Sequence, residues 1–107
     1  MRSIRESDWK LFRELRPIAL DRYCERTLGE IAEIAADTRR PSKERYYAIF
    51  DLVRQRDRAL ADLFDDPRRS TALLQLALIY SAGLLTEDEL ARFSPEARES
   101  ATWRQRL

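Results

Sequence analysis

Apolar side chains recur at three- and four-residue intervals along most of this chain, a spacing that is typical of helices. Residues 17–36 carry one apolar stripe with a 3.6-residue period opposite a charged face. Residues 42–64 keep a near-heptad spacing that is interrupted at Arg56, which we expect to reach water or an acidic partner. Each helix would be about 30 Å long, and the short connection between them predicts an antiparallel hairpin. The stripe in residues 17–36 consists of Leu20, Cys24, Leu28, Ile31 and either Ile34 or Ala35.

Capping residues and prolines set the expected ends of these helices. Ser7 is expected to cap a short first helix. Pro17 is expected to separate that helix from the next, because proline disfavours helical geometry in the residue before it. Ser42 is expected to cap the helix of residues 42–64.

Residues 73–80 are apolar except for Gln75. Their leucine and alanine content favours a helix over a strand, and Gly83 follows where a helix-ending glycine belongs. We expect a buried helix that needs more cover than the two long helices supply. This predicts a homodimer or another bound protein. The candidate interface residues are Trp9, Leu73, Leu76, Tyr80 and Trp103.

The segment from Gly83 to Glu89 matches the second half of a calcium-binding EF-hand loop, with glycine sixth and glutamate twelfth. The first half does not match, since the positions that should supply side-chain oxygen ligands hold no carboxylate. We therefore expect no calcium site. Instead, Gly83 should end one helix, and Thr86 with Glu89 should form a capping box for the next. The Ser94-Pro95 pair likewise predicts the start of a last helix.

Composition favours one folded, all-α domain over residues 1–107. Hydrophobic residues make up 44% and charged residues 36%, with two glycines and four prolines, a balance that suits helices. We expect a hairpin or bundle of about four to six helices, two of them long and antiparallel. The sequence contains no apolar run of membrane-spanning length and no secretory signal, so we expect a cytoplasmic protein without membrane contact.

The charges are balanced, but the basic side chains are skewed toward arginine. The formal net charge is +1, and only Lys10 and Lys43 are lysines. Arginine-rich sequences arise from phosphate contacts, from an ion-paired surface or from a coding bias. Because aspartates accompany each arginine cluster, we favour the ion-paired surface over nucleic-acid binding, which stays the alternative. The candidate nucleic-acid contacts are Arg39, Arg40, Arg54, Arg56, Arg58, Arg68 and Arg69.

The sequence lacks the side chains that most catalytic and metal sites use. It has no histidine, which excludes His-based acid/base catalysis, and one cysteine without histidine leaves no zinc site. Two glycines cannot form either common phosphate-binding loop. Acidic pairs such as Asp21 with Glu25 lie among arginines, as on a solvated helix face. We expect no enzyme, cofactor or metal, and a buried, inert Cys24.

The stretch from Ser7 to Arg13 reads Ser-Asp-Trp-Lys-x-Phe-Arg, and the C-terminal part carries a glycine, an acidic turn with a leucine, and a Phe-Ser pair. In these two stretches the chain resembles a group of small uncharacterised bacterial helical proteins. The matching C-terminal residues are Gly83, Asp88, Leu90, Phe93 and Ser94. Residues 38–69 match that group poorly. The resemblance implies a helical fold and supplies no activity, ligand or catalytic residue.

These features together predict a non-enzymatic helical interaction or regulatory protein. We expect it to self-associate, as a dimer, or to cover an apolar helix or groove of another protein.

Overall fold

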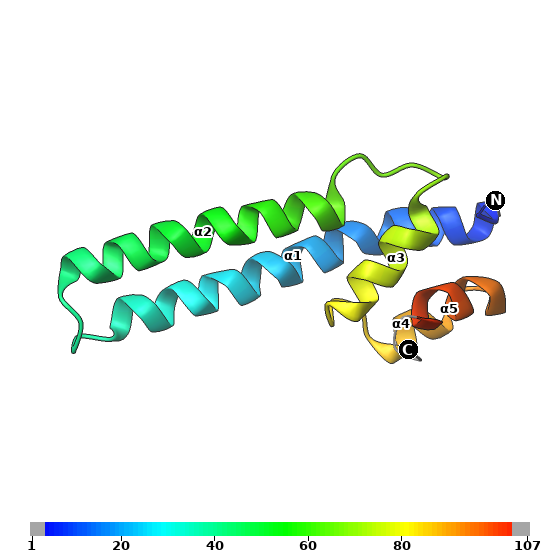
Figure 1. The fold of residues 1–107 in the computed structure, drawn as a ribbon. Coiled ribbons are helices and arrows are strands. Elements are labelled where there is room, and N and C mark those ends of the chain that lie inside the picture. The colour runs from blue at the N-terminus through cyan, green and yellow to red at the C-terminus, as the bar shows by residue number, and fades with distance from the viewer. Residues whose placement is uncertain (1–3, 104–107) are drawn as a thin grey trace.

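Two long antiparallel helices form a hairpin, and three short helices gather at the end of the hairpin where the chain begins (Figure 1). The structure is a computed structural model and describes residues 4–103. The helices are α1 (Glu6–Ala36), α2 (Ser42–Phe64), α3 (Ala72–Ser81), α4 (Glu87–Ala91) and α5 (Pro95–Thr102). The described residues contain no strand, so the predicted all-α class and the long antiparallel pair are confirmed.

The predicted break at Pro17 is wrong, because α1 continues through it as one helix of 31 residues. A proline inside a helix removes one backbone hydrogen bond. Here the side chains on either side of it, Leu15 and Ala19, are both buried in the same core, which holds the two segments in one continuous helix. Ser7 is not the cap either, since α1 begins one residue earlier and Arg5 occupies the N-cap position.

The predicted bounds of α2 are confirmed, but its predicted cap is wrong. Pro41 occupies the N-cap position, and no side chain caps the helix. Ser42 is the first helical residue, and its Oγ accepts a hydrogen bond from the guanidinium of Arg45 at 3.1 Å.

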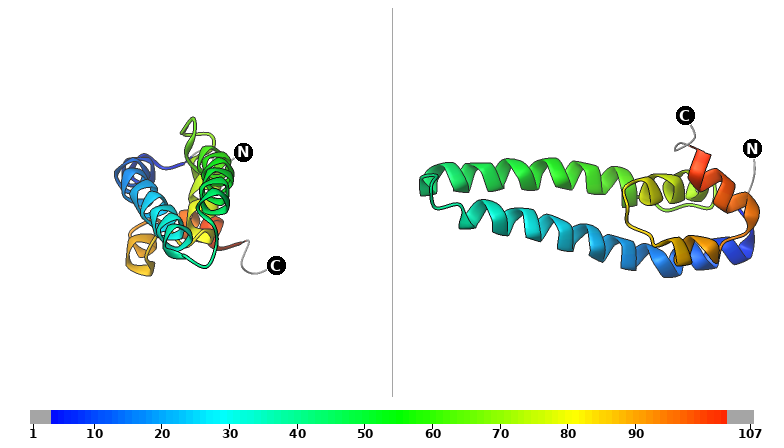
Figure 2. Two further views of the ribbon diagram at one scale, coloured as in Figure 1. Left: turned by 90° about the vertical axis from the view of Figure 1, so that its left-hand side faces the viewer. Right: turned by 90° about the horizontal axis from the view of Figure 1, so that it is seen from below.

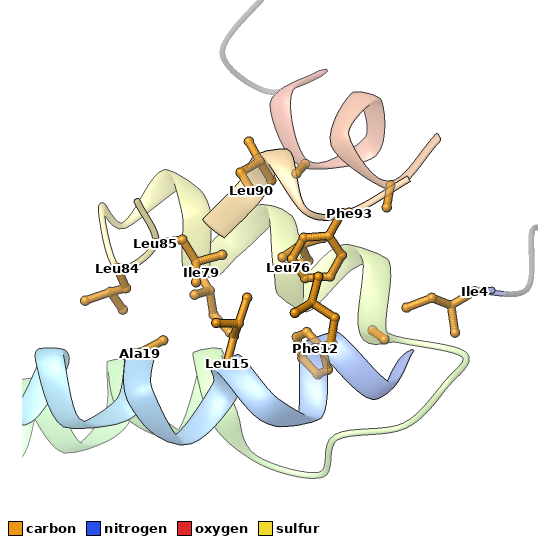
Figure 3. Close-up of a cluster of buried hydrophobic side chains, with 14 of the residues drawn as sticks. Ile4, Phe12, Leu15, Ala19, Leu76, Ile79, Leu84, Leu85, Leu90 and Phe93 are labelled. Atoms are coloured by element: carbon orange, nitrogen blue, oxygen red, sulfur yellow. The ribbon is translucent and has the colours of Figure 1, made fainter. Parts of the chain in front are cut away.

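The hydrophobic core lies at one end of the hairpin (Figure 3). We call this end the head: residues 4–23 together with Phe64 and helices α3 to α5. Phe12 and Leu15 of α1 pack against Leu76 and Ile79 of α3 and Phe93 before α5, and all five side chains are at most 3% exposed. The predicted burial of α3 is confirmed, because five of its ten residues are buried. Its expected lack of cover is wrong for most of the helix, since α1, α2 and α5 of the same chain pack around it, but Leu74 stays 54% exposed.

The turns of the head follow the predicted capping chemistry. Gly83 ends α3 with a φ of 74°, in the left-handed region that favours glycine. Thr86 and Glu89 form the predicted capping box of α4. Ser94 caps α5 by accepting a hydrogen bond from the backbone N–H of Ala97.

The remaining part of the hairpin, which we call the arm, extends away from the head (Figure 2). The arm comprises residues 24–63, and within this described stretch no residue is buried. Helix α2 has 23 residues, and its only buried residue is Phe64, at the head. The molecule is therefore elongated, with extents of 52 × 28 × 25 Å. Among the described residues, no helix is long and apolar enough to cross a membrane.

Candidate interaction surface on the arm

A groove of about 250 Å³ runs between α1 and α2 on one face of the hairpin. Its floor is the seam between the two helices, and its walls are mostly apolar. The groove is lined by Tyr23, Cys24, Thr27, Leu28, Ile31, Val53, Arg56, Asp57 and Leu60.

Several large apolar side chains of the arm, at the groove and beside it, are exposed to solvent. Leu28 is 59% exposed, Phe50 is 51% exposed and Val53 is 44% exposed. Tyr46, Phe50 and Val53 follow one another at intervals of four and three residues, so they lie along one stripe of α2. Single exposed apolar side chains are ordinary, but a continuous patch marks a contact surface. We call this face of residues 24–63 the arm face.

Polar contacts hold the floor of the groove in place. The guanidinium of Arg56 donates to both carboxylate oxygens of Glu30, at 2.7 and 3.0 Å. These bonds lower the pKa of the Glu30 carboxyl. The Tyr23 hydroxyl donates to the backbone carbonyl of Arg56 at 2.7 Å, and burial raises the pKa of this phenol. The interruption of the heptad pattern at Arg56 thus meets an acidic partner, one of the two predicted outcomes.

Cys24 is exposed, so the prediction of a buried thiol is wrong. The sequence places Cys24 correctly on the apolar stripe of α1, together with Leu28 and Ile31. That stripe borders the groove and is not covered by another helix of this chain. The error therefore lies in assuming that an apolar face is buried within a single copy.

The arginine clusters do not converge on one surface. Arg39 lies in the loop at the far end of the arm and pairs with Asp37 at 2.9 Å. Arg40, in the same loop, lies 4.0 Å from the Glu44 carboxylate. Arg68 and Arg69 lie at the other end of the molecule, between α2 and α3.

The arginines at the head end are also matched with acidic groups. Arg68 pairs with Asp66 at 2.6 Å. Arg69 pairs with Glu6 at 3.0 Å and places its guanidinium over the Trp9 ring. This agrees with the ion-paired surface that the alternating charges predicted.

The three arginines in the middle of α2 do not all share one face, because Arg56 points away from the other two. Arg56 lies at the seam with Glu30. The guanidinium of Arg54 sits 5.7 Å from the centre of the Phe50 ring. Arg54 and Arg58 both line a shallow polar pocket with Asp51 and Gln55. A helix turns by about 100° per residue, so Arg56 lies about 200° from each of the other two, whereas Arg54 and Arg58 are four residues apart and share a face.

The five predicted interface residues do not form the exposed surface either. Leu76 is 1% exposed and belongs to the core, which corrects its assignment to an interface. Trp9 stacks on Phe12 with ring centres 6.0 Å apart, and Leu73 packs against the core. The Tyr80 hydroxyl donates to the Glu87 carboxylate at 2.7 Å. Among the five, Trp103 alone is exposed.

Two arginines of α1 hold the turn between α3 and α4, although no pattern in the sequence singles them out. The guanidinium of Arg26 donates to the carbonyls of Ala82 at 2.8 Å and Gly83 at 3.2 Å. Arg22 donates to the carbonyl of Leu84 at 3.0 Å. These bonds satisfy backbone acceptors at and just beyond the end of α3, which a helix terminus leaves without partners.

Arg22 also holds Glu89 in a two-pronged ion pair, with distances of 2.6 and 3.0 Å. Glu89 accepts a further bond from the backbone N–H of Thr86 at 2.8 Å. Chiefly because of the bonds from Arg22, the pKa of the Glu89 carboxyl falls from 4.5 to about 2. The carboxylate that resembled a calcium ligand is therefore occupied by a guanidinium and a capping box.

Comparisons with known proteins found no relative of this chain. The chain matches no protein-family model, no curated protein and no solved structure at a significant level. Within residues 4–103, no three acidic or cysteine side chains cluster in a way that could hold a metal ion.

Proposed function

We propose that this protein is a non-enzymatic interaction module whose arm face docks an apolar helical surface of a protein. The observation that carries the proposal is the absence of any buried residue in the described stretch 24–63, although that stretch has the apolar periodicity of two packed helices. In a helix bundle, further helices cover an apolar face of this kind, and none of the described helices covers it here.

The physical reason is the geometry of a two-helix hairpin. Two helices bury only the seam between them, whereas a bundle buries a stripe on each helix because further helices cover it. Ile31 and Leu60 illustrate this, since each lies at the seam, lines the groove and stays partly exposed. Covering a large apolar side chain fully is worth about 1.5–3 kcal/mol, so a partner helix gains several kcal/mol here before its binding costs.

The shape of the groove favours a helix as the docked element. The groove follows the direction of α1 and α2, and helices pack along such grooves with axes about 8–10 Å apart. Of its two charged lining residues, Arg56 is already bonded to Glu30, which leaves Asp57 as the other. The groove therefore offers an apolar contact and few free polar groups to orient a small substrate.

The setting that we propose for this function is the cytoplasm. Cys24 lines the groove and is exposed, and a reducing compartment keeps such a thiol from oxidation.

Site-specific photo-crosslinking in the native host cells tests the proposal. A photoreactive amino acid replaces Val53, which lines the groove, in one variant and Gln55 in a matched control. Gln55 lies two residues further along α2, about 200° round the helix, and lines a polar pocket that shares no residue with the groove. We expect a protein adduct from position 53 and little from position 55.

The mass and identity of the adduct show what docks on the arm face. Equal yields at positions 53 and 55, or no adduct at position 53 in protein that folds, would contradict the proposal. Helix content by circular dichroism establishes that both variants fold.

A further inference from the structure

We infer that the occupant of the arm face is a second copy of this chain, with α1 of each copy lying over α2 of the other. The inference rests on the proposed function, since it requires the arm face to be a docking surface. The resulting dimer has a four-helix bundle made from two arms and a twofold axis parallel to the arms.

The size of the arm face fits a modest homodimer. Two helices of about 10 Å diameter, over about 25 Å of length, present a face of about 500 Å² in projection. Pairing two such faces removes at least about 1,000 Å² of surface from water, near the lower limit of about 1,200 Å² for stable specific interfaces. A face of this area therefore suits a reversible dimer.

The charges at the two edges of the arm face have opposite signs. Along α1, Asp21 and Glu25 lead at intervals of four and three residues to Leu28, which lines the groove. Along α2, Lys43 and Arg54 lie on the stripe of Phe50, and all three side chains are exposed. The α1 edge is thus acidic, and the α2 edge carries two basic side chains.

One acidic residue, Asp57, lines the groove near the α2 edge. It lies three residues beyond Arg54, within reach of the same helix face. Asp51 lines pockets with Lys43 and Arg54, but it is two residues from Val53 and so lies about 200° round the helix from the groove. Nearer the groove, Lys43 and Arg54 outnumber Asp57, so the α2 edge keeps a positive balance.

A hydrogen bond within the hairpin sets the relative level of the two edges. The Tyr23 hydroxyl reaches the carbonyl of Arg56, so these residues lie at the same level along the arm. Glu25 on α1 and Arg54 on α2 each lie two residues closer to the loop that joins these helices. A twofold axis parallel to the arm preserves levels, so each Glu25 faces Arg54 of the other copy.

The alternative stacking, with α1 over α1 and α2 over α2, does not have this complementarity. It places the acidic α1 edges of the two copies, which carry Asp21 and Glu25, against each other. The basic α2 edges, which carry Arg54, also meet. Like charges brought together across an interface suppress that pairing.

Charge reversal tests the arrangement by sedimentation equilibrium of the purified chain. We expect the wild-type chain to form a dimer, and Glu25→Arg and Arg54→Glu each to raise its dissociation constant at least about tenfold, because each creates two like-charged pairs per dimer. An equimolar mixture of the two variants should dimerise again, since every pair in the mixed dimer is then complementary. The matched control Glu33→Arg, two residues from Ile31 and therefore on the opposite side of α1, should leave the dissociation constant within about twofold.

The outcomes separate this inference from the proposed function. A wild-type chain that stays monomeric, while position 53 still gives an adduct with another protein, overturns the homodimer and leaves the docking function standing. A dimer that neither reversal weakens, or that the mixture does not restore, overturns the arrangement of α1 over α2. A monomer without any adduct at position 53 overturns both.

Discussion

The carboxylate of Asp8 accepts two hydrogen bonds from Ser94, one from its backbone N–H at 2.9 Å and one from its hydroxyl at 2.6 Å. The two residues are 86 positions apart in the sequence. Asp8 is 4% exposed and lies near the start of α1, whereas Ser94 caps α5. This contact fastens the last helix of the head to the first.

Asp8→Ala should lower the free energy of unfolding by about 2 kcal/mol, because it leaves the partly buried N–H and hydroxyl of Ser94 without their charged acceptor. Urea denaturation followed by circular dichroism measures the change. Glu14→Ala is the control, since Glu14 also joins α1 to the C-terminal part, through Arg92 at 3.5 Å, but both side chains are more than half exposed. It should cost less than about 0.5 kcal/mol. Equal costs for the two variants would contradict the role assigned to Asp8.

Glu89 should make the head sensitive to acid. Its pKa is lowered from 4.5 to about 2 in the folded chain, so the unfolded chain binds the proton more readily. The stabilisation is complete above about pH 4.5 and is lost as the pH falls toward 2. We expect this group to contribute about 2 kcal/mol to the free energy of unfolding near neutral pH, allowing for the partial exposure of Arg22.

The measurement compares the free energy of unfolding of the wild-type chain and Glu89→Gln between pH 6 and pH 2. The difference between them should be largest at pH 6 and shrink below about pH 4.5 as Glu89 takes up its proton. A difference that does not change with pH would show that the ion pair with Arg22 adds nothing to stability.

The two glycines should respond to alanine in opposite directions. Gly83 has a φ of 74°, where a side chain strains the backbone, so Gly83→Ala should destabilise the fold by about 1–2 kcal/mol. Gly29 lies inside α1 with open space around its Cβ position, so Gly29→Ala should stabilise it by up to about 1 kcal/mol. Thermal unfolding of both variants measures the signs. A stabilising Gly83→Ala would refute the turn geometry at the end of α3.

The sequence predicts the helices well because periodicity and capping act locally. The bounds of α2, the burial of α3 and the capping box of Thr86 with Glu89 all follow from such patterns. The same reasoning is wrong at Pro17, because the packing of its neighbours in the core outweighs the local preference for a helix break before proline.

The sequence predicts the position of the candidate surface less well than it predicts the helices. An apolar stripe such as that of Cys24 and Leu28 shows that one face avoids water, but it does not show whether the cover comes from the same chain. The sequence pointed to α3 as the uncovered helix, and the structure places the uncovered face on the arm instead. Long-range contacts such as Arg26 with the carbonyl of Gly83 join segments 57 residues apart and leave no periodic signal.

Hydrogen exchange of the arm tests whether an apolar partner completes it. Backbone exchange in residues 24–36 and 42–63 is compared with exchange in α3, at about 2 µM and about 200 µM protein. If the partner is a second copy, exchange in the arm slows markedly at the higher concentration, while α3 in the head changes little. Arm exchange that is the same at both concentrations, and the same again with the protein captured at position 53 added, would contradict the account.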